Sequence, residues 1–188
     1  MMLLEHNLTK LIEGCQSGNR KAQEMLYRLF SAKMLGVCLR YATGRQEAED
    51  MLQNGFIKVF GNIKAYRGEG SFEGWVRRIM VHSSIEYYRR RHKMMQLAET
   101  DPAGAEPSVD AAAASSLEAK DLLAMIQTLP TGYRLVFNLY ALEGYAHKEI
   151  GEMLHISEGA SKSQLSRARA ILKEMINKTE GVTNENFG

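Results

Sequence analysis

Cysteine, proline and long apolar runs are all scarce in this chain of 188 residues. Its two cysteines, Cys15 and Cys38, lie far apart within helix-like patterns, which favours free thiols in a reducing compartment over a disulfide. No segment approaches the roughly 20 apolar residues that span a bilayer, and the N-terminus lacks the basic and apolar regions of a signal peptide. We therefore expect a soluble, cytoplasmic protein without direct membrane insertion.

Strand-like alternation of apolar and polar residues is missing as well, whereas helical spacing recurs in nearly every long segment. Two apolar stripes flank the polar stretch 43–47, and a third helix is expected over about residues 71–93. The stripes are Ala22, Met25, Leu26, Leu29, Phe30 and Val37, then Ala48, Leu52, Phe56, Val59, Phe60 and Ile63. The third helix is expected to bury Phe72, Trp75, Val76, Ile79 and Ile85. The fold class is therefore all-α, and it begins with a helical bundle.

Two of the three prolines, Pro102 and Pro107, lie in a stretch rich in alanine, serine and acids that has little to bury. We interpret residues 96–117 as a flexible acidic linker. It would join two small helical domains, residues 1–95 and residues 118–180.

Helical spacing resumes after the linker, where Pro130 suits the first turn of a helix that Gly144 ends. A short helix, a turn of about three residues and a longer helix follow, with Ser157 as the natural N-cap of the longer one. This order predicts a helix-turn-helix.

The last helix has two different faces. The expected packing face holds Ser161, Leu165, Ala168 and Leu172. The opposite face is basic and rich in hydroxyls, with Lys162, Ser163, Ser166 and Arg167. Such side chains reach base edges and phosphates when a recognition helix enters the major groove of DNA. A solvated charged face fits the same spacing equally well.

Charge is segregated although the net charge is only +2. Residues 77–93 hold six Lys or Arg against the single acid Glu86, whereas residues 94–119 hold five acids and no Lys or Arg. The basic segment follows the loop "AYRGEGS" and several aromatics. This combination suits single-stranded nucleic acid, because cations neutralise phosphates and rings stack on bases for about 1–3 kcal/mol each. Core aromatics beside a solvated helix end are the alternative.

Catalytic chemistry has no support in the sequence. "RGEGS" lacks the GK[ST] of a phosphate-binding loop, the acids form no close metal cluster, and no histidine stands at ligand spacing with a cysteine. No nucleophile and base pair is evident. We expect a protein that is not an enzyme and that needs no metal or cofactor.

Four segments, in this order, cover most of the chain: "AEDMLQNGFIKVFGNIKAYRGEGSFEGWVRRI", "IEYYRRRHK", "LPTGYRLVFNLYALEGYAHKEIGEML" and "SEGASKSQLSRARAILK". Together with the linker they resemble RNA polymerase sigma factors of the extracytoplasmic-function (ECF) group. The resemblance implies that residues 1–95 are sigma region 2 and residues 118–180 are sigma region 4. It also implies binding to core RNA polymerase, through the β′ clamp helices and the β subunit, and to promoter DNA in duplex and single-stranded form.

The resemblance implies a role for particular residues. Contact with the β′ clamp helices would fall to Asp50, Gln53, Asn54 and Ile57. Recognition and melting of the minus-10 element would fall to Tyr66, Arg67, Ser71, Phe72, His82, Glu86, Arg89 and Arg90. Recognition of the minus-35 element would fall to Ser157, Lys162, Ser163, Ser166 and Arg167. An anti-sigma partner would cover these same surfaces.

Four positions depart from the family pattern. Asn54 stands where the family often has Glu, His82 where it often has Asn, and Glu86 where it often has Asp. Ser161 replaces a branched aliphatic on the packing face of the last helix, so we expect that helix to sit differently or to be less stable.

Two other hypotheses fit parts of the sequence. One is a stand-alone helix-turn-helix regulator whose N-terminal bundle dimerises or senses a signal. The other is a helical enzyme that processes nucleic acid.

Overall fold

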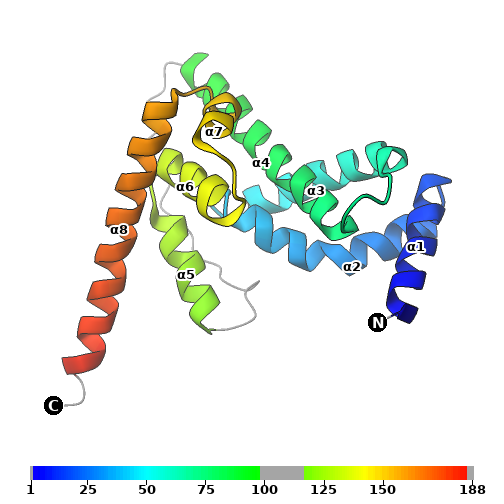
Figure 1. Cartoon of the computed structure of the whole chain (residues 1–188), viewed down its shortest axis with the longest axis horizontal. Helices are drawn as coiled ribbons and strands as arrows, with labels where there is room; N and C mark the ends of the chain where they lie inside the picture. The colour runs from blue at the N-terminus through cyan, green and yellow to red at the C-terminus, as the bar shows by residue number, and fades with distance from the viewer. Residues whose placement is uncertain (1, 98–116, 186–188) are drawn as a thin grey trace. The chain divides into compact units, whose positions relative to one another are not determined.

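The computed structural model describes residues 2–97 and 117–185, and every regular element within those residues is helical, as predicted (Figure 1). The chain divides into two compact units, Met1–Arg90 and Arg91–Gly188. In the part of the chain that is described, no helix is both long and apolar enough to cross a membrane.

The first unit is built from four α-helices and a short 3₁₀ helix. These are α1 (Met2–Gln16), α2 (Arg20–Leu39), α3 (Arg45–Asn62), η1 (Ile63–Ala65) and α4 (Phe72–Leu97), of which α4 continues past the end of the unit. Helix α2 packs against both α1 and α3. Asn19 caps α2 by accepting hydrogen bonds from the N–H groups of Lys21 and Ala22 at 2.9 and 3.2 Å. Such caps satisfy donors that the first turn of a helix leaves unpaired.

The core of the first unit follows the predicted stripes in most positions. The buried side chains include Leu26, Phe30, Val37, Leu52, Phe56, Val59, Phe72, Val76 and Ile85. Phe60, Trp75 and Ile79 are half-buried. Gly55 lets α4 approach α3 closely, because a Cβ atom on Gly55 would lie 2.2 Å from the sulfur of Met80.

Two members of the first stripe were predicted wrongly. Met25 and Leu29 are 57% and 58% exposed. Each precedes a buried residue, Leu26 or Phe30, by one position, which is about 100° around a helix. The buried face of α2 is therefore narrower than the run of apolar residues in the sequence.

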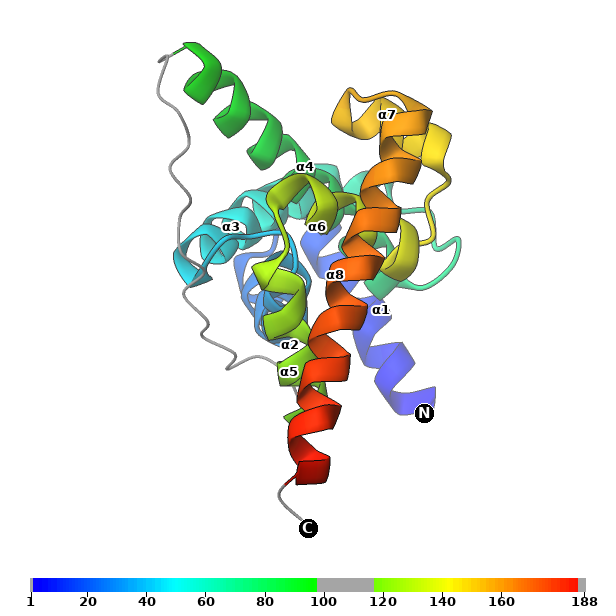
Figure 2. The same cartoon turned by 90° about the vertical axis from the view of Figure 1, so that its left-hand side faces the viewer.

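The second unit holds α5 (Leu117–Thr128), α6 (Thr131–Phe137), the π-helical segment η2 (Asn138–Leu142), α7 (His147–Leu154) and α8 (Glu158–Glu185). Helix α8 packs against α5, α6 and α7 (Figures 1 and 2). Pro130 is the N-cap of α6 rather than part of its first turn, and Gly144, at φ 79°, follows the end of η2.

The predicted helix-turn-helix is confirmed as α7, a turn over residues 155–157, and α8. His155 adopts the left-handed conformation at φ 55°, and its N–H donates to the carbonyl of Gly151. Gly151 leaves room for the turn, because a Cβ atom there would lie 2.8 Å from the carbonyl oxygen of Ile156. The angle between α7 and α8 thus depends on Gly151 having no side chain.

The predicted linker falls almost wholly on residues 98–116, which lie outside the described residues. At its edges, residues 96 and 97 belong to α4, and Leu117 begins α5. Helix α4 is therefore longer than the expected 71–93.

Replacing Gly151 by Ala should destabilise the second unit by about 1–3 kcal/mol, because the new methyl group would collide with the backbone of the turn. Urea unfolding of the whole chain measures the loss. Gly159→Ala is the matched control, since its nearest atom, Ser157 Oγ, is 3.9 Å away and a helical Ala is ordinarily favourable. A Gly151→Ala chain as stable as the wild type would contradict this account of the turn.

Candidate nucleic-acid and protein interfaces

The outward side of α3 is a polar face with one apolar residue, Ile57, at one end. All four residues expected to bind a protein partner lie on it and are exposed: Asp50, Gln53, Asn54 and Ile57. Ile57 is 69% exposed. The Asn54 amide donates to the carbonyl of Asp50 at 2.9 Å. We call these four residues the docking face.

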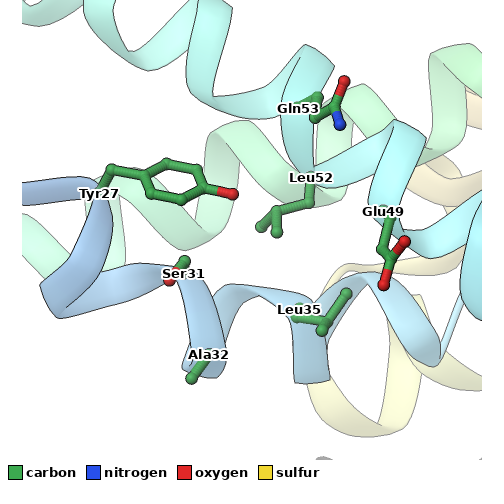
Figure 3. Close-up of a pocket in the computed structure, with 7 residues that line it drawn as sticks. All are labelled: Tyr27, Ser31, Ala32, Leu35, Glu49, Leu52 and Gln53. Carbon is green, nitrogen blue, oxygen red and sulfur yellow. The ribbon is translucent and has the colours of Figure 1, made fainter. Parts of the chain in front are cut away.

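A groove between α2 and α3 adjoins the docking face at Gln53 (Figure 3). The Tyr27 ring extends across it from α2 toward Leu52 of α3, and packs on Phe56 with ring centroids 4.6 Å apart. The groove is lined by Tyr27, Ser31, Ala32, Leu35, Glu49, Leu52 and Gln53. Its volume of about 260 Å³ is small for a cofactor site, which typically needs about 300–1,000 Å³. Helical spacing did not predict this groove, because it does not show which α2 residues flank α3.

Residues 66–71 form a loop. It is anchored by an aromatic cluster that consists of Tyr66, Phe72 and Trp75. The Tyr66 ring lies 5.0 Å from Phe72 and 5.5 Å from Trp75, and its hydroxyl donates to the carbonyl of Gly70 at 3.0 Å. Gly68 and Gly70 adopt φ values of 78° and 77°, which other residues rarely tolerate. The loop conformation is thus fixed by side chains and by glycine.

The predicted DNA-binding residues in and beside this loop differ in what they present to solvent. Arg67 and Ser71 are exposed, Tyr66 is half-buried, and Phe72 is only 3% exposed. The Ser71 hydroxyl also accepts a hydrogen bond from the N–H of Gly74 at 3.0 Å, in the first turn of α4. Phe72 therefore supports the loop, whereas Arg67 and Ser71 offer groups that a ligand can reach.

Further along α4, Glu86 is held by two cations. Lys58 of α3 and Arg90 both donate to its carboxylate. The hydrogen bond from Lys58 is the main reason that the pKa of Glu86 lies below its ordinary value. Partial desolvation, followed by the charges of Arg78 and Lys58, lowers the pKa of His82. At neutral pH this surface therefore presents a neutral imidazole and an ionised, cation-bound carboxylate.

Beyond Glu86, α4 carries a run of exposed basic residues. Arg89, Arg90, Arg91, His92 and Lys93 are all exposed. The cationic cluster that the sequence indicated is therefore on the surface, where phosphates are accessible to it.

The last helix has the two faces that its spacing predicted. Its packing face is buried: Ser161, Leu165, Ala168 and Leu172. Its polar residues are exposed: Lys162, Ser163, Ser166 and Arg167. Ser157, also exposed, accepts a hydrogen bond from the N–H of Ala160 at 3.0 Å and so caps the helix as expected.

Both exposed cations of this polar face have partners within the chain. Lys162 pairs with Glu158 at 2.6 Å, and Arg167 donates to the hydroxyl of Tyr133 at 3.2 Å. Both side chains are thereby oriented on the helix surface, but solvent screens exposed contacts of this kind and keeps them weak. A phosphate can therefore displace either partner.

The cysteines are free, as predicted, and both are buried. Burial raises the pKa of Cys15, and it raises the pKa of Cys38 to about 12. Neither thiol is a nucleophile at neutral pH. Within residues 2–97 and 117–185, no three His, Cys, Asp or Glu side chains come together as a metal site.

Two family models match the chain, one in each half. "Sigma-70 region 2" matches residues 26–94, and "Sigma-70, region 4" matches residues 119–172. They cover the loop and basic helix in the first case and the helix-turn-helix in the second.

Relatives that match most of this chain agree with these models. The chain is 29% identical to the "ECF RNA polymerase sigma-E factor" of Haemophilus influenzae over 178 residues, which is 88% of this chain and 93% of the relative. It is 30% identical over 162 residues to the "ECF RNA polymerase sigma factor SigE" of Mycolicibacterium smegmatis, covering 84% of this chain and 63% of that protein.

A solved structure shares the fold. The sigma factor RpoE of Bartonella quintana, solved in complex with the anti-sigma factor NepR, is 19% identical with a TM-score of 0.54. The match covers 82% of this chain and 96% of that one.

Lys58→Met should raise the pKa of Glu86 toward its ordinary value of 4.5, because the main hydrogen bond to the carboxylate is lost. In the wild type, a folded pKa below the unfolded value means that Glu86 adds stability above about pH 4.5, which is lost as the pH falls through the lowered pKa. Carboxyl-carbon NMR titration measures the shift. Lys64→Met, another exposed lysine, is the control, and an unchanged Glu86 pKa in Lys58→Met would refute the assignment.

Proposed function

Since this chain belongs to the ECF group of sigma-70 factors, which give core RNA polymerase its promoter specificity without enzymatic activity, we propose how its residues divide that work. Residues 1–95 act as region 2: they dock on the polymerase and capture the minus-10 element. Residues 118–180 act as region 4 and read the minus-35 element, with residues 96–117 as the tether between them. The observation that carries this division is the match of two different sigma regions, in order, to two compact units.

The docking face binds the β′ clamp helices of the polymerase. Its exposed Ile57 supplies an apolar contact, and Asp50, Gln53 and Asn54 on the two preceding turns supply polar groups; protein interfaces combine both kinds of surface. The groove beside Gln53 extends this surface onto α2. Exposed Met25 and Leu29 are further apolar surface on α2, of a kind that marks interaction sites when it is contiguous.

Loop 66–71 and the outer side of α4 capture and melt the minus-10 element. Arg67 and Ser71 are accessible to a base or a phosphate, and the aromatic cluster keeps the loop in one conformation, which lowers the entropy lost on binding. Beyond the loop, the DNA would pass along α4, where it would meet the neutral His82 together with Glu86, Arg89 and Arg90. Binding free energy offsets unstacking, which costs a few kcal/mol per extruded base, so melting needs no catalytic residue.

The recognition helix α8 reads the minus-35 element as duplex DNA. Ser163 and Ser166 face solvent on the polar side of the helix, where hydroxyls can bond to base edges. Lys162 and Arg167 flank them and exchange their internal partners for phosphates. The capped N-terminus at Ser157 lies beside them and favours a nearby phosphate.

Regulation would use the same surfaces. A structural relative was solved in complex with an anti-sigma factor. We expect a comparable partner to cover the docking face of this protein, in the cytoplasm where the polymerase works. A polymerase bound at the docking face would exclude that partner.

Run-off transcription on fragmented genomic DNA, with core polymerase and mapping of transcript 5′ ends, tests the function. The wild type should create new starts that share two upstream elements. Asp50→Ala with Gln53→Ala should lower polymerase affinity by at least about tenfold, as loss of an interface hot spot does, and should abolish those starts. Glu174→Ala with Asn177→Ala is the matched control: an exposed acid and amide with the same spacing on α8. New starts undiminished by the Asp50 and Gln53 changes would place docking elsewhere, and DNA binding without any new start would favour a stand-alone regulator.

Promoter binding should also depend on salt through Arg167. Arg167→Ala should reduce the slope of log affinity against log salt by about one, the value for one lost phosphate contact. Fluorescence anisotropy of the polymerase complex at several salt concentrations measures it. Lys178→Ala, an exposed cation on the same helix, should leave the slope unchanged. Equal slopes for Arg167→Ala and the wild type would remove Arg167 from the interface.

A further inference from the structure

The packing face of the recognition helix contains one polar residue among apolar ones. Ser161 is 0% exposed and lies one turn before Leu165, with Ala168 and Leu172 following on the same face. A buried hydroxyl without a hydrogen-bond partner destabilises a fold. Here Oγ of Ser161 is hydrogen-bonded to Nδ1 of His147, 2.9 Å away in α7. The bond forms with either tautomer of the imidazole, because a hydroxyl both donates and accepts.

His147 is itself held from a third element. Its ring stacks on Tyr140 of η2, with ring centroids 4.5 Å apart and planes inclined by 20°. The guanidinium of Arg169, back on α8, lies 5.6 Å from the centre of the Tyr140 ring. Side-chain contacts therefore run from Ser161 to His147 to Tyr140 to Arg169, so the chain of contacts begins and ends on α8. Helix α8 is therefore contacted at Ser161 and at Arg169, which are eight residues or about two turns apart.

This arrangement controls the rotation of α8 about its own axis. Successive helical residues are separated by about 100° of rotation and about 1.5 Å of rise, so the position of Ser161 fixes where Lys162 and Ser163 point. Apolar contacts are not directional and tolerate small rotations of a helix, whereas a hydrogen bond weakens steeply when its angle is wrong. The polar pair thus restricts the helix in a way that an aliphatic residue at position 161 would not.

We propose that Ser161 and His147 are positioning residues for minus-35 recognition: their hydrogen bond sets the orientation of α8, and with it the direction of the side chains that read the bases. Neither residue needs to touch DNA for this role. The proposal rests on the function of region 4 proposed above. The serine is the reason why the last helix keeps a defined position, rather than a defect in its packing.

The pair is tested in the complete polymerase complex, on a promoter identified by transcript mapping. The quantity measured is a preference: the ratio of affinities for that promoter and for one whose minus-35 element is replaced while the minus-10 element is kept. Ser161→Ala removes the hydroxyl, and His147→Phe keeps a ring to stack on Tyr140 but removes the nitrogen. Each should reduce the preference by about five- to tenfold, the equivalent of one hydrogen bond, and the double variant should lose no more than either single one.

Rescue separates positioning from general destabilisation. His147→Asn places an amide nitrogen close to where Nδ1 lies and should retain most of the preference. Ser84→Ala is the matched control, because Ser84 is a fully buried serine in the first unit, hydrogen-bonded to the carbonyl of Met80 at 2.9 Å. It should leave the minus-35 preference unchanged, even if thermal unfolding shows a lower melting temperature.

Three results would overturn the proposal. The first is an unchanged preference in Ser161→Ala and His147→Phe, whatever their stability. The second is a His147→Asn chain as defective as His147→Phe, which would show that the hydrogen bond is not the important feature. The third is a wild-type complex that starts transcription at no promoter, which would refute the proposed function itself before any variant is compared.

Discussion

Burial of one face of each helix is the constraint on which every functional surface of this protein depends. In α3, Leu52 and Phe56 pack inward, so Gln53 and Ile57 must face outward one position later. In α8, burial of Leu165 leaves Ser166 in solvent. The pattern of apolar residues therefore has two effects. It holds each unit together, and it determines which polar residues a polymerase or a promoter can reach.

Burial alone leaves the exact positions of loops and side chains approximate, and polar contacts fix them. Tyr66 pins the loop to the aromatic cluster, Lys58 holds Glu86 from the neighbouring helix, and His147 holds the buried hydroxyl of Ser161. Each contact restricts a surface that would otherwise sample several conformations, and an ordered surface loses less entropy when it binds.

Helical spacing predicted the fold class, the helix-turn-helix, the cap at Ser157 and both faces of the last helix, because these depend on residues near one another in sequence. It failed for Met25 and Leu29, since the width of a buried face depends on what packs against it. The pairing of Glu86 with Lys58 joins residues 28 positions apart, and that of Ser161 with His147 joins residues 14 apart. Spacing within one helix carries no information about such pairs. The DNA-contact and polymerase-contact residues came from the family resemblance, and they stay predictions.

In the proposed function, two separate surfaces of one chain contact two separate promoter elements. Photo-crosslinking tests it most directly, with a photoreactive amino acid replacing Arg67 in one chain and Ser163 in another, each assembled with core polymerase on the mapped promoter. We expect crosslinks from position 67 to the minus-10 element and from position 163 to the minus-35 element. Crosslinks from both positions to the same element, or from neither to DNA, would contradict it.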